Sequence, residues 1–234
     1  MTLQKLTILA CVFVLLSCTE NRRQQPSNAL QEVEYIDIEM KEKEEECDDD
    51  SIIVVSNYTF EEAIAGTRAP QHIIDQLELF DVVYLSTDGQ LHQGQIISNR
   101  AIAQDIREIF EFMLEHGFVI ERAIPIVRYN WCDTISMDVN NSHSFNYRKI
   151  AGTNRLSLHA TGMAIDINPR FNPVRWPDNV RPNQPEGAVH DHSVNGTLYP
   201  GHPVVAEFRR RGFHWGHWFR RFYDDHHFER RDFQ

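Results

Sequence analysis

The chain of 234 residues is long enough for one domain of ordinary size, with some residues left over. Its formal net charge is −11, but residues 19–50 alone carry 12 Asp and Glu against 4 Lys and Arg, a net of −8. No stretch has the basic, aromatic-rich character that binds nucleic acid, so the composition predicts no nucleic-acid partner and says little about other ligands.

The N-terminus has the pattern of a secretory signal. Lys5 precedes an apolar run at 6–16, which is too short to span a bilayer. The run ends in Leu-Leu-Ser-Cys at 15–18, which resembles a bacterial lipoprotein processing site. That resemblance implies cleavage before Cys18 and attachment to a membrane through lipid on this cysteine. Thr19 favours the outer membrane, and the alternative is an ordinary secretory signal with an incidental cysteine.

The sequence is therefore predicted to divide into three segments: a signal peptide at 1–17, an acidic flexible tether at 18–50 and a folded domain at 51–234. The tether is predicted to stay extended because a dense run of charges cannot bury a core. Beyond the signal and the lipid site, the remaining cysteines are Cys47 and Cys132, which an oxidising periplasm would permit to pair.

The first half of the domain is predicted to contain short strands and one long helix. Its first elements are, in chain order, an edge strand or docking arm at 51–55, a helix begun by a capping box at 59–64, and hairpin strands at 80–85 and 91–97. Apolar residues then recur with a helical period over 102–114. Asn99 is the expected N-cap of this helix, and Gly117 is the expected stop.

The second half is predicted to be richer in loops. Its elements are a strand at 118–128, a loop at 129–148, a strand–turn–strand at 157–166, a loop at 169–203, a helix at 204–211 and a final strand within 213–229. The loop at 129–148 is long for a mere connection, which favours a functional role. Together the elements predict an α+β fold with a central, mainly antiparallel sheet and helices packed to one side.

A candidate metal centre lies in the strand–turn–strand segment. Strand alternation would place Ser157 and His159 on one face, and the second arm would bring Asp166 to the same polar surface. An imidazole and a carboxylate held in this way need one more nitrogen ligand to form a three-ligand site with an open position, as in catalytic zinc sites. The distal Asp-x-x-His at 224–227 can supply that ligand, together with a carboxylate to act on water.

This interpretation has a simpler rival. A histidine and an aspartate seven positions apart, taken alone, more often form a hydrogen-bonded surface pair. The presence of two segments that each hold His and Asp among apolar residues favours the metal site. His-Asp-His at 190–192 is another potential metal-binding pair, but it lies in a polar loop and stays outside the predicted site.

The two segments also carry a family resemblance. Ser-x-His-x-x-Gly-x-Ala-x-Asp-Ile-Asn-Pro at 157–169, followed by Asp-x-x-His-Phe-Glu at 224–229, resembles the zinc-dependent D-alanyl-D-alanine carboxypeptidase and L-alanyl-D-glutamate endopeptidase family, the LAS-type peptidases of bacterial cell walls. The polar segment at 136–148 resembles that family as well. The likeness covers roughly Phe80 to Glu229.

The resemblance implies a Zn²⁺ site made by His159, Asp166 and His227, with the adjacent His226 left out because the family pattern is His-Phe-Glu. Ser157, two positions before a ligand, would orient that ligand by a hydrogen bond, although an ordinary structural serine explains it nearly as well. A zinc ion in such a site lowers the pKa of water and polarises a carbonyl.

The resemblance also implies the roles of two further residues. Asp224 would act as general base on the water, and Arg148 would clamp a substrate carbonyl or carboxylate. The implied protein is an α+β LAS/Hedgehog-type zinc peptidase, expected as a monomer, that hydrolyses an amide bond of peptidoglycan stem peptides in the periplasm. Carboxypeptidase and endopeptidase cleavage both stay open.

One departure from the family and two alternatives qualify this interpretation. Trp-Gly-His-Trp at 215–218 is one residue shorter than the family pattern and has an extra histidine, which puts the rim of the site and its substrate preference in question. A binding protein on the same scaffold could hold metal without turnover, although it would have no need for Asp224. A zinc hydrolase acting on another amide is the third possibility, because fold and metal do not fix the substrate.

Overall fold

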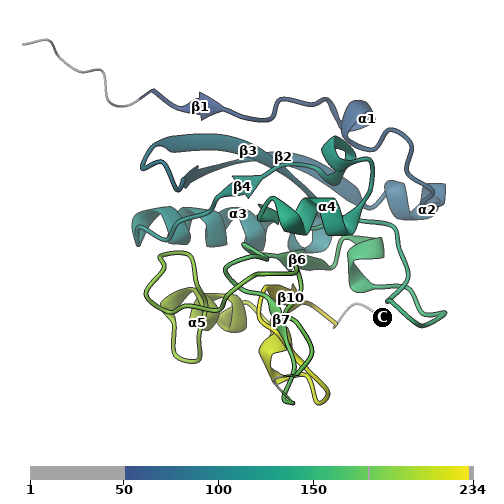
Figure 1. Cartoon of the computed structure of the whole chain (residues 1–234). Helices are drawn as coiled ribbons and strands as arrows, with labels where there is room; N and C mark the ends of the chain where they lie inside the picture. The colour runs from purple at the N-terminus through teal and green to yellow at the C-terminus, as the bar shows by residue number, and fades with distance from the viewer. Residues whose placement is uncertain (1–50, 179, 232–234) are drawn as a thin grey trace, which may run out of the picture. The chain divides into compact units, whose positions relative to one another are not determined.

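The computed structural model of the chain describes residues 51–178 and 180–231 (Figure 1). The predicted signal peptide, lipid site and tether, together with Cys47, lie outside the described residues and stay predictions. Helices and strands are mixed along the described part of the chain, which confirms the α+β class. In that part, no helix combines the length and the apolar character needed to cross a membrane.

A long β-hairpin forms the first sheet. Strand β2 (Leu77–Leu85) pairs antiparallel with β3 (Leu91–Asn99) along its whole length, and both strands extend beyond the apolar runs that predict them. The turn contains Asp88 and Gly89, and Gly89 has a φ of +79°, a left-handed conformation that glycine adopts without strain. Strand β1 (Ile53–Val54) adds parallel to β3 at the edge. The predicted hairpin and edge strand are confirmed.

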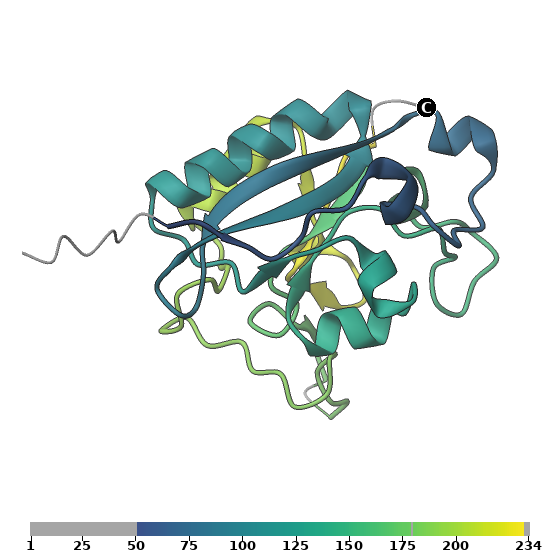
Figure 2. The same ribbon diagram turned by 90° about the horizontal axis from the view of Figure 1, so that it is seen from above.

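An amphipathic helix, α3 (Arg100–Glu115), packs along this hairpin (Figure 2). It begins where the Asn99 side chain accepts a hydrogen bond from Ala101 N at 3.0 Å, and it ends just before Gly117, whose φ is +63°. Both predicted boundaries are confirmed. The residues that α3 buries are Ile102, Ala103, Ile106, Ile109, Phe110 and Met113.

The second sheet carries both candidate ligand segments. Its order is β6 (Ala164–Asp166), β10 (His227–Glu229) and β8 (His214–Trp215), and all pairs are antiparallel. The register of β6 and β10 places His227 opposite Asp166. Ile165 and Phe228, which are also paired, are fully buried on the other face of the sheet. Alternation along these strands therefore separates a polar site from the core.

One hydrophobic core joins the hairpin, the second sheet and two helices. Helix α5 (Pro203–Arg210) packs against α3 and begins where the side chain of His202 accepts a hydrogen bond from Val204 N at 3.1 Å. Phe208 of this helix stacks on Phe228 of β10 with ring centroids 3.8 Å apart. The helix predicted at 204–211 is therefore confirmed, and it supports the strand that carries one candidate ligand.

The strands are divided among small sheets, and a single central sheet is not found in the described part of the chain. Besides the two three-stranded sheets, β4 (Arg122–Ala123) pairs with β5 (Asn141–Ser142), and β7 (Val174–Arg175) pairs with β9 (Tyr223–Asp224). These strands are two residues long, so they brace loops around the site without forming a continuous sheet.

Other segments differ from the predictions in detail. The strand expected at 118–128 is reduced to β4, because Pro125 interrupts it and the 3-10 helix η1 (Ile126–Tyr129) follows. The predicted loop at 129–148 contains a short helix, α4 (Asp133–Asp138). The remaining small elements are the predicted α1 (Phe60–Ala63), with its capping box present, the unpredicted α2 (Gln71–Ile74) and the 3-10 helix η3 (Gly216–Trp218).

Candidate metal centre

The segment 157–166 does not form the predicted strand–turn–strand. Its first arm is the 3-10 helix η2 (Leu158–Thr161), and Ser157 caps it by accepting a hydrogen bond from His159 N at 3.3 Å. Local capping by the serine therefore prevails over strand alternation. The second arm is β6, as predicted. The predicted shared strand face of Ser157 and His159 is wrong, and the serine contacts the backbone of the ligand residue.

Gly162 joins the two arms at a point where only glycine fits. Its φ is +68°, and a Cβ atom would lie 2.6 Å from Asn99 N. The same backbone nitrogen donates a hydrogen bond to Gly162 O at 2.9 Å. The turn that carries the candidate ligands is thereby fixed to the junction of β3 and α3.

Three candidate ligand atoms converge despite the changed local structure. His159 Nε2 lies 3.2 Å from Asp166 Oδ1 and 3.1 Å from His227 Nδ1, and the last two atoms lie 3.0 Å apart. Zinc bonds of about 2.0–2.1 Å in a tetrahedral site separate ligand atoms by about 3.3 Å. The three distances fit that requirement, so these residues can hold a zinc ion with one position left open.

Hydrogen bonds fix which ring nitrogen of each histidine faces the centre. His159 Nδ1 donates to the carbonyl oxygen of Ser144 at 2.6 Å, which leaves Nε2 for a metal. His227 Nε2 donates to Glu229 Oε2 at 3.1 Å, which leaves Nδ1. Such outer partners orient histidine ligands and raise their basicity. The arrangement is therefore pre-oriented for metal binding.

The buried centre favours positive charge. Burial opposes ionisation of Asp166, but the neighbouring imidazoles, His159 first, hold the pKa of its carboxyl well below its usual range. Burial lowers the pKa of His159, so its Nε2 keeps a free lone pair. Burial would also lower the pKa of His227, but hydrogen bonds to Asp166 and Glu229 raise it to about 10. A bound metal ion would replace the proton that His227 Nδ1 otherwise carries.

The adjacent histidine, His226, points elsewhere. Its Nδ1 donates to the carbonyl oxygen of Asn172 at 2.7 Å, and its Nε2 lies 3.0 Å from Asp224 Oδ1. Its distance to Asp166 Oδ1 is 4.0 Å. Burial would lower the pKa of His226, but the charges of Asp224 and Asp166 raise it to about 9. His226 therefore lies where it holds Asp224, while His227 meets the other two candidate ligands.

Arg148 is held by residues that the sequence did not single out. One of its terminal nitrogens lies 2.9 Å from Asp133 Oδ2, on the first residue of α4. His143 Nε2 lies 3.6 Å from the other oxygen of this carboxylate. Burial would raise the pKa of Asp133, but His143 and Arg148 hold it below its usual range. The aspartate is therefore an ionised partner that orients the guanidinium.

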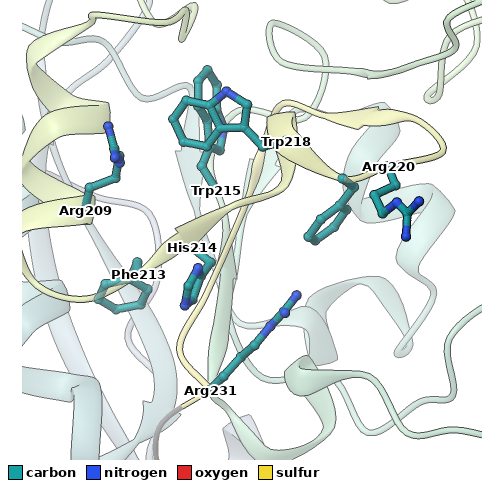
Figure 3. Close-up of a pocket in the computed structure, with 8 residues that line it drawn as sticks. Arg209, Phe213, His214, Trp215, Trp218, Arg220 and Arg231 are labelled. Carbon is teal, nitrogen blue, oxygen red and sulfur yellow. The ribbon is translucent and has the colours of Figure 1, made fainter.

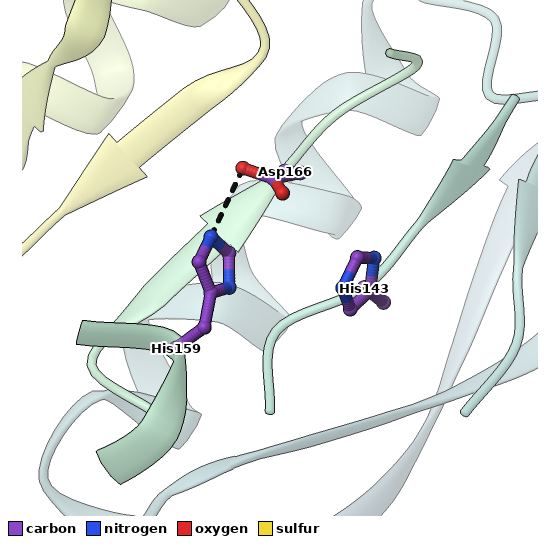
Figure 4. Close-up of side chains that lie close together, drawn as sticks. All are labelled: His143, His159 and Asp166. Carbon is purple, nitrogen blue, oxygen red and sulfur yellow. Dashed lines mark ion pairs between the residues drawn. The ribbon is translucent and has the colours of Figure 1, made fainter. Parts of the chain in front are cut away.

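His143 also belongs to a second group of residues that could hold a metal, with His159 and Asp166 (Figure 4). One ligand atom from each lies within 4.8 Å of the others. Neither ring nitrogen of His143 has a hydrogen-bond partner in the described part of the chain. The closer spacing of the group with His227, together with its opening to the cleft described next, favours His227 as the third ligand.

The three converging residues line a cleft of about 660 Å³. This volume falls in the range of sites for small ligands, about 300–1,000 Å³. Arg148 and Arg155 line it together with the aromatic rings of Phe219 and Phe222. Asp224 faces the same cleft, whereas the neighbouring Asp225 is fully buried. The cleft thus combines a metal-binding centre, a carboxylate outside the ligand set and cationic side chains.

Residues 151–230 match the family model of D-alanyl-D-alanine carboxypeptidases. The matched range contains the three converging residues and Asp224, but it does not reach Arg148. The match supports this peptidase family, and with it a zinc-dependent peptidase. No curated protein and no solved structure matches the chain.

Several residues that build the centre have no clear sequence signal. Ser144 contributes a backbone carbonyl, which residue type does not reveal. Asp133 begins helix α4 and His143 follows strand β5, two short elements that lack periodic patterns. Glu229 is the exception, because it belongs to the His-Phe-Glu motif and its position two residues after His227 on a strand predicts a shared face.

Proposed function

We propose that the protein is a zinc-dependent peptidase that hydrolyses an amide bond in peptidoglycan stem peptides. The observation that carries the proposal is the convergence of His159 Nε2, Asp166 Oδ1 and His227 Nδ1 at 3.0–3.2 Å on the wall of a cleft that also contains Asp224. The family match to residues 151–230 supports the peptidase, and the peptidoglycan substrate is our extension of it.

His159, Asp166 and His227 would hold the zinc ion. When bound, zinc supplies a Lewis acid that polarises a carbonyl and makes water more acidic. The protein's own contribution is to keep the two imidazoles oriented through Ser144 and Glu229 and to keep Asp166 ionised. The rest of the chemistry falls to side chains that handle protons and the substrate.

Asp224 is the proposed general base. It lines the cleft, and His226 at 3.0 Å fixes its carboxylate by a charge-assisted contact. From there it can take a proton from water as the carbonyl is attacked and then deliver that proton to the leaving amine. The pairing with His226 serves this role, because a general base must be held within reach of the water.

Arg148 is the proposed substrate clamp. Its guanidinium is about one-third exposed at the cleft while Asp133 holds it from behind at 2.9 Å. An arginine held in this way offers its remaining N–H groups to a carbonyl or carboxylate in a fixed orientation. This placement supports substrate positioning near the metal without a role in metal binding.

The experiment is digestion of defined muropeptides by the full-length, zinc-loaded protein, with the products identified by mass spectrometry. Asp224→Asn runs beside it, with its zinc content measured. Loss of a terminal D-alanine, or a cut after L-alanine, would establish the enzyme and name the bond. No cleavage by the zinc-loaded wild type would overturn the proposal and favour a non-catalytic binding protein. Full activity of Asp224→Asn would refute the assigned base.

We also propose that lipid on Cys18 anchors the protein to a membrane, and that the acidic tether lets the domain reach its substrate in the wall from within the periplasm. The support is the Leu-Leu-Ser-Cys pattern at 15–18 and the acidic segment that follows. Labelling of cells with radioactive palmitate tests this proposal. Label should enter the wild-type protein and be absent from Cys18→Ser, and equal labelling of the two proteins would refute it.

A further inference from the structure

A second pocket adjoins the metal cleft and has no role in the chemistry described so far (Figure 3). Its volume is about 440 Å³, and it shares Phe219 and Arg231 with the metal cleft. Arg148 and Arg155 line only the metal cleft. Phe219 and Arg231 therefore form a wall common to the two cavities, which places the second pocket beside the metal cleft.

The second pocket is cationic. Arg209, Arg220 and Arg231 line it, and no acidic residue does. The composition of the domain does not explain this, because residues 51–234 hold 18 Lys and Arg against 22 Asp and Glu, a net charge of −4. Within residues 51–178 and 180–231, Arg231 pairs with Glu229, whereas neither Arg209 nor Arg220 forms an ion pair with a carboxylate. Two guanidinium groups therefore lack a carboxylate partner in this part of the chain, and that of Arg209 stacks over the Trp218 ring, 4.9 Å from its centroid.

The walls of the pocket are aromatic and come from separate segments. Figure 3 shows Arg209 on α5, Trp215 just before η3, Trp218 at the end of η3, and Arg231 on the C-terminal segment. Trp215 is buried and donates to the carbonyl oxygen of Asp225 at 2.8 Å, which fixes this wall. Trp218 is 51% exposed and packs edge-on against Trp215. A large, half-exposed ring beside arginines that lack carboxylate partners is typical of a binding surface.

We propose that this arginine pocket, lined by Arg209, Arg220 and Arg231, binds a carboxylate of the peptide substrate other than its C-terminal one. Arginine forks match carboxylate oxygens in geometry and charge, and Trp218 provides an apolar face for the adjoining chain. The inference rests on the proposed function and narrows its substrate class. The preferred substrate is an acidic peptide that extends from the metal past Phe219, whereas a free dipeptide would fill only the metal cleft.

The choice of test residues follows from the contacts. Arg231 bonds to Glu229, which in turn accepts a hydrogen bond from His227, so a change at Arg231 would also disturb a candidate metal ligand. Arg209 and Arg220 are exposed, have no such connection and line only the arginine pocket. The double variant Arg209→Gln/Arg220→Gln therefore tests the pocket alone. Arg221→Gln is the matched control, because Arg221 is exposed nearby and lines neither cavity.

The experiment compares two synthetic stem peptides with the full-length, zinc-loaded protein. One peptide keeps all its carboxylates, and in the other every carboxylate except the C-terminal one is a carboxamide. For wild type and for Arg221→Gln, we expect the amidated peptide to have a KM about tenfold higher or more, since ionic hydrogen bonds are lost. For the double variant, we expect the two peptides to have similar KM values. Equal KM values for the two peptides with wild type would overturn the inference.

A binding measurement separates this inference from the proposed function. Calorimetry with the Asp224→Asn protein gives the affinity of each peptide without turnover. Tighter binding of the acidic peptide by about tenfold, lost on adding the Arg209→Gln/Arg220→Gln changes, supports the pocket even if the wild type cleaves neither peptide. Equal affinity for the acidic and amidated peptides refutes it, even if the wild type cleaves both.

Discussion

The adjacent His226 and His227 offer the sharpest test of the site, because exchanging their roles would change both the metal ligand and the position of the base. The structure separates them clearly. His227 Nδ1 lies 3.0 Å from Asp166 Oδ1, whereas the nearest nitrogen of His226 lies 4.0 Å from that oxygen and 3.0 Å from Asp224. Glutamine at each position keeps a polar side chain of similar reach without an imidazole nitrogen, so His227→Gln and His226→Gln form a matched pair.

The expected effects differ in kind as well as in size. His227→Gln removes one of three ligands and should weaken zinc binding by more than about a hundredfold, beyond the 10- to 100-fold range typical of residues that only support a ligand. His226→Gln should stay within or below that range. It should instead lower kcat by about ten- to a hundredfold, because Asp224 loses the partner that fixes it and small misplacements of catalytic groups are costly.

Competition with a chelator of known affinity, followed by metal analysis, measures the first quantity, and turnover at saturating zinc measures the second. Circular dichroism checks that both variants fold, since His226 and His227 are buried. If His226→Gln lost zinc as completely as His227→Gln, the assignment of ligands would be wrong. If His227→Gln kept zinc at wild-type affinity, the group with His143 would become the better metal site.

Three further predictions concern the support of the site and the stability of the fold. Asp133→Asn should raise KM by about tenfold with a smaller change in kcat, because Arg148 loses the charged partner that orients it. Steady-state kinetics in which kcat fell more than KM rose would contradict this prediction. Hydrogen bonds from two arginines of α5 and its C-cap lower the pKa of Glu207 from 4.5 to about 2, so its stabilising effect is complete above pH 4.5 and is lost as the pH falls towards 2. The melting temperature should therefore fall less steeply between pH 5 and pH 2 for Glu207→Gln than for the wild type. Parallel curves of melting temperature against pH would refute the effect. Gly162→Ala should lower the free energy of unfolding by about 2 kcal/mol or more, as measured by denaturant unfolding. Gly89 has a similar φ, but an added Cβ would meet nothing within 4 Å, so Gly89→Ala should cost about 1 kcal/mol. Equal losses for the two variants would contradict the steric argument.

Local signals in the sequence predicted the elements that depend on local physics. Asn99 and Gly117 bound α3 because capping and left-handed glycine act within one turn of chain. The hairpin forms around Gly89 for the same reason. The prediction of a strand at 118–128 was wrong because a single proline interrupts the apolar run. The prediction of one central sheet was wrong because pairing between strands that are distant in the chain leaves little signal in a single sequence.

The candidate ligands were predictable even though their local structure was not. His159 was placed on a strand and lies on a 3-10 helix, yet it still meets Asp166, because Gly162 turns the chain back in either case. The types of residue and their order in the chain therefore predict the metal centre better than strand alternation does. The supporting contacts of Asp133 and Ser144 could not be predicted, since they arise only when the chain around His143 pairs with Asp166 of β6.

The net charge of the chain likewise does not predict the local charge of its pockets. The net charge of −11 is concentrated in residues 19–50, and the domain itself is mildly acidic, so composition favours no anionic ligand. The fold nevertheless gathers Arg209, Arg220 and Arg231 around one pocket from segments that are separate in the chain. Electrostatic attraction for a substrate depends on this local grouping, because charges more than about 10 Å away are screened at moderate salt. An acidic domain can therefore select an acidic peptide, and the dependence of KM on ionic strength should be stronger for the acidic stem peptide than for its amidated counterpart.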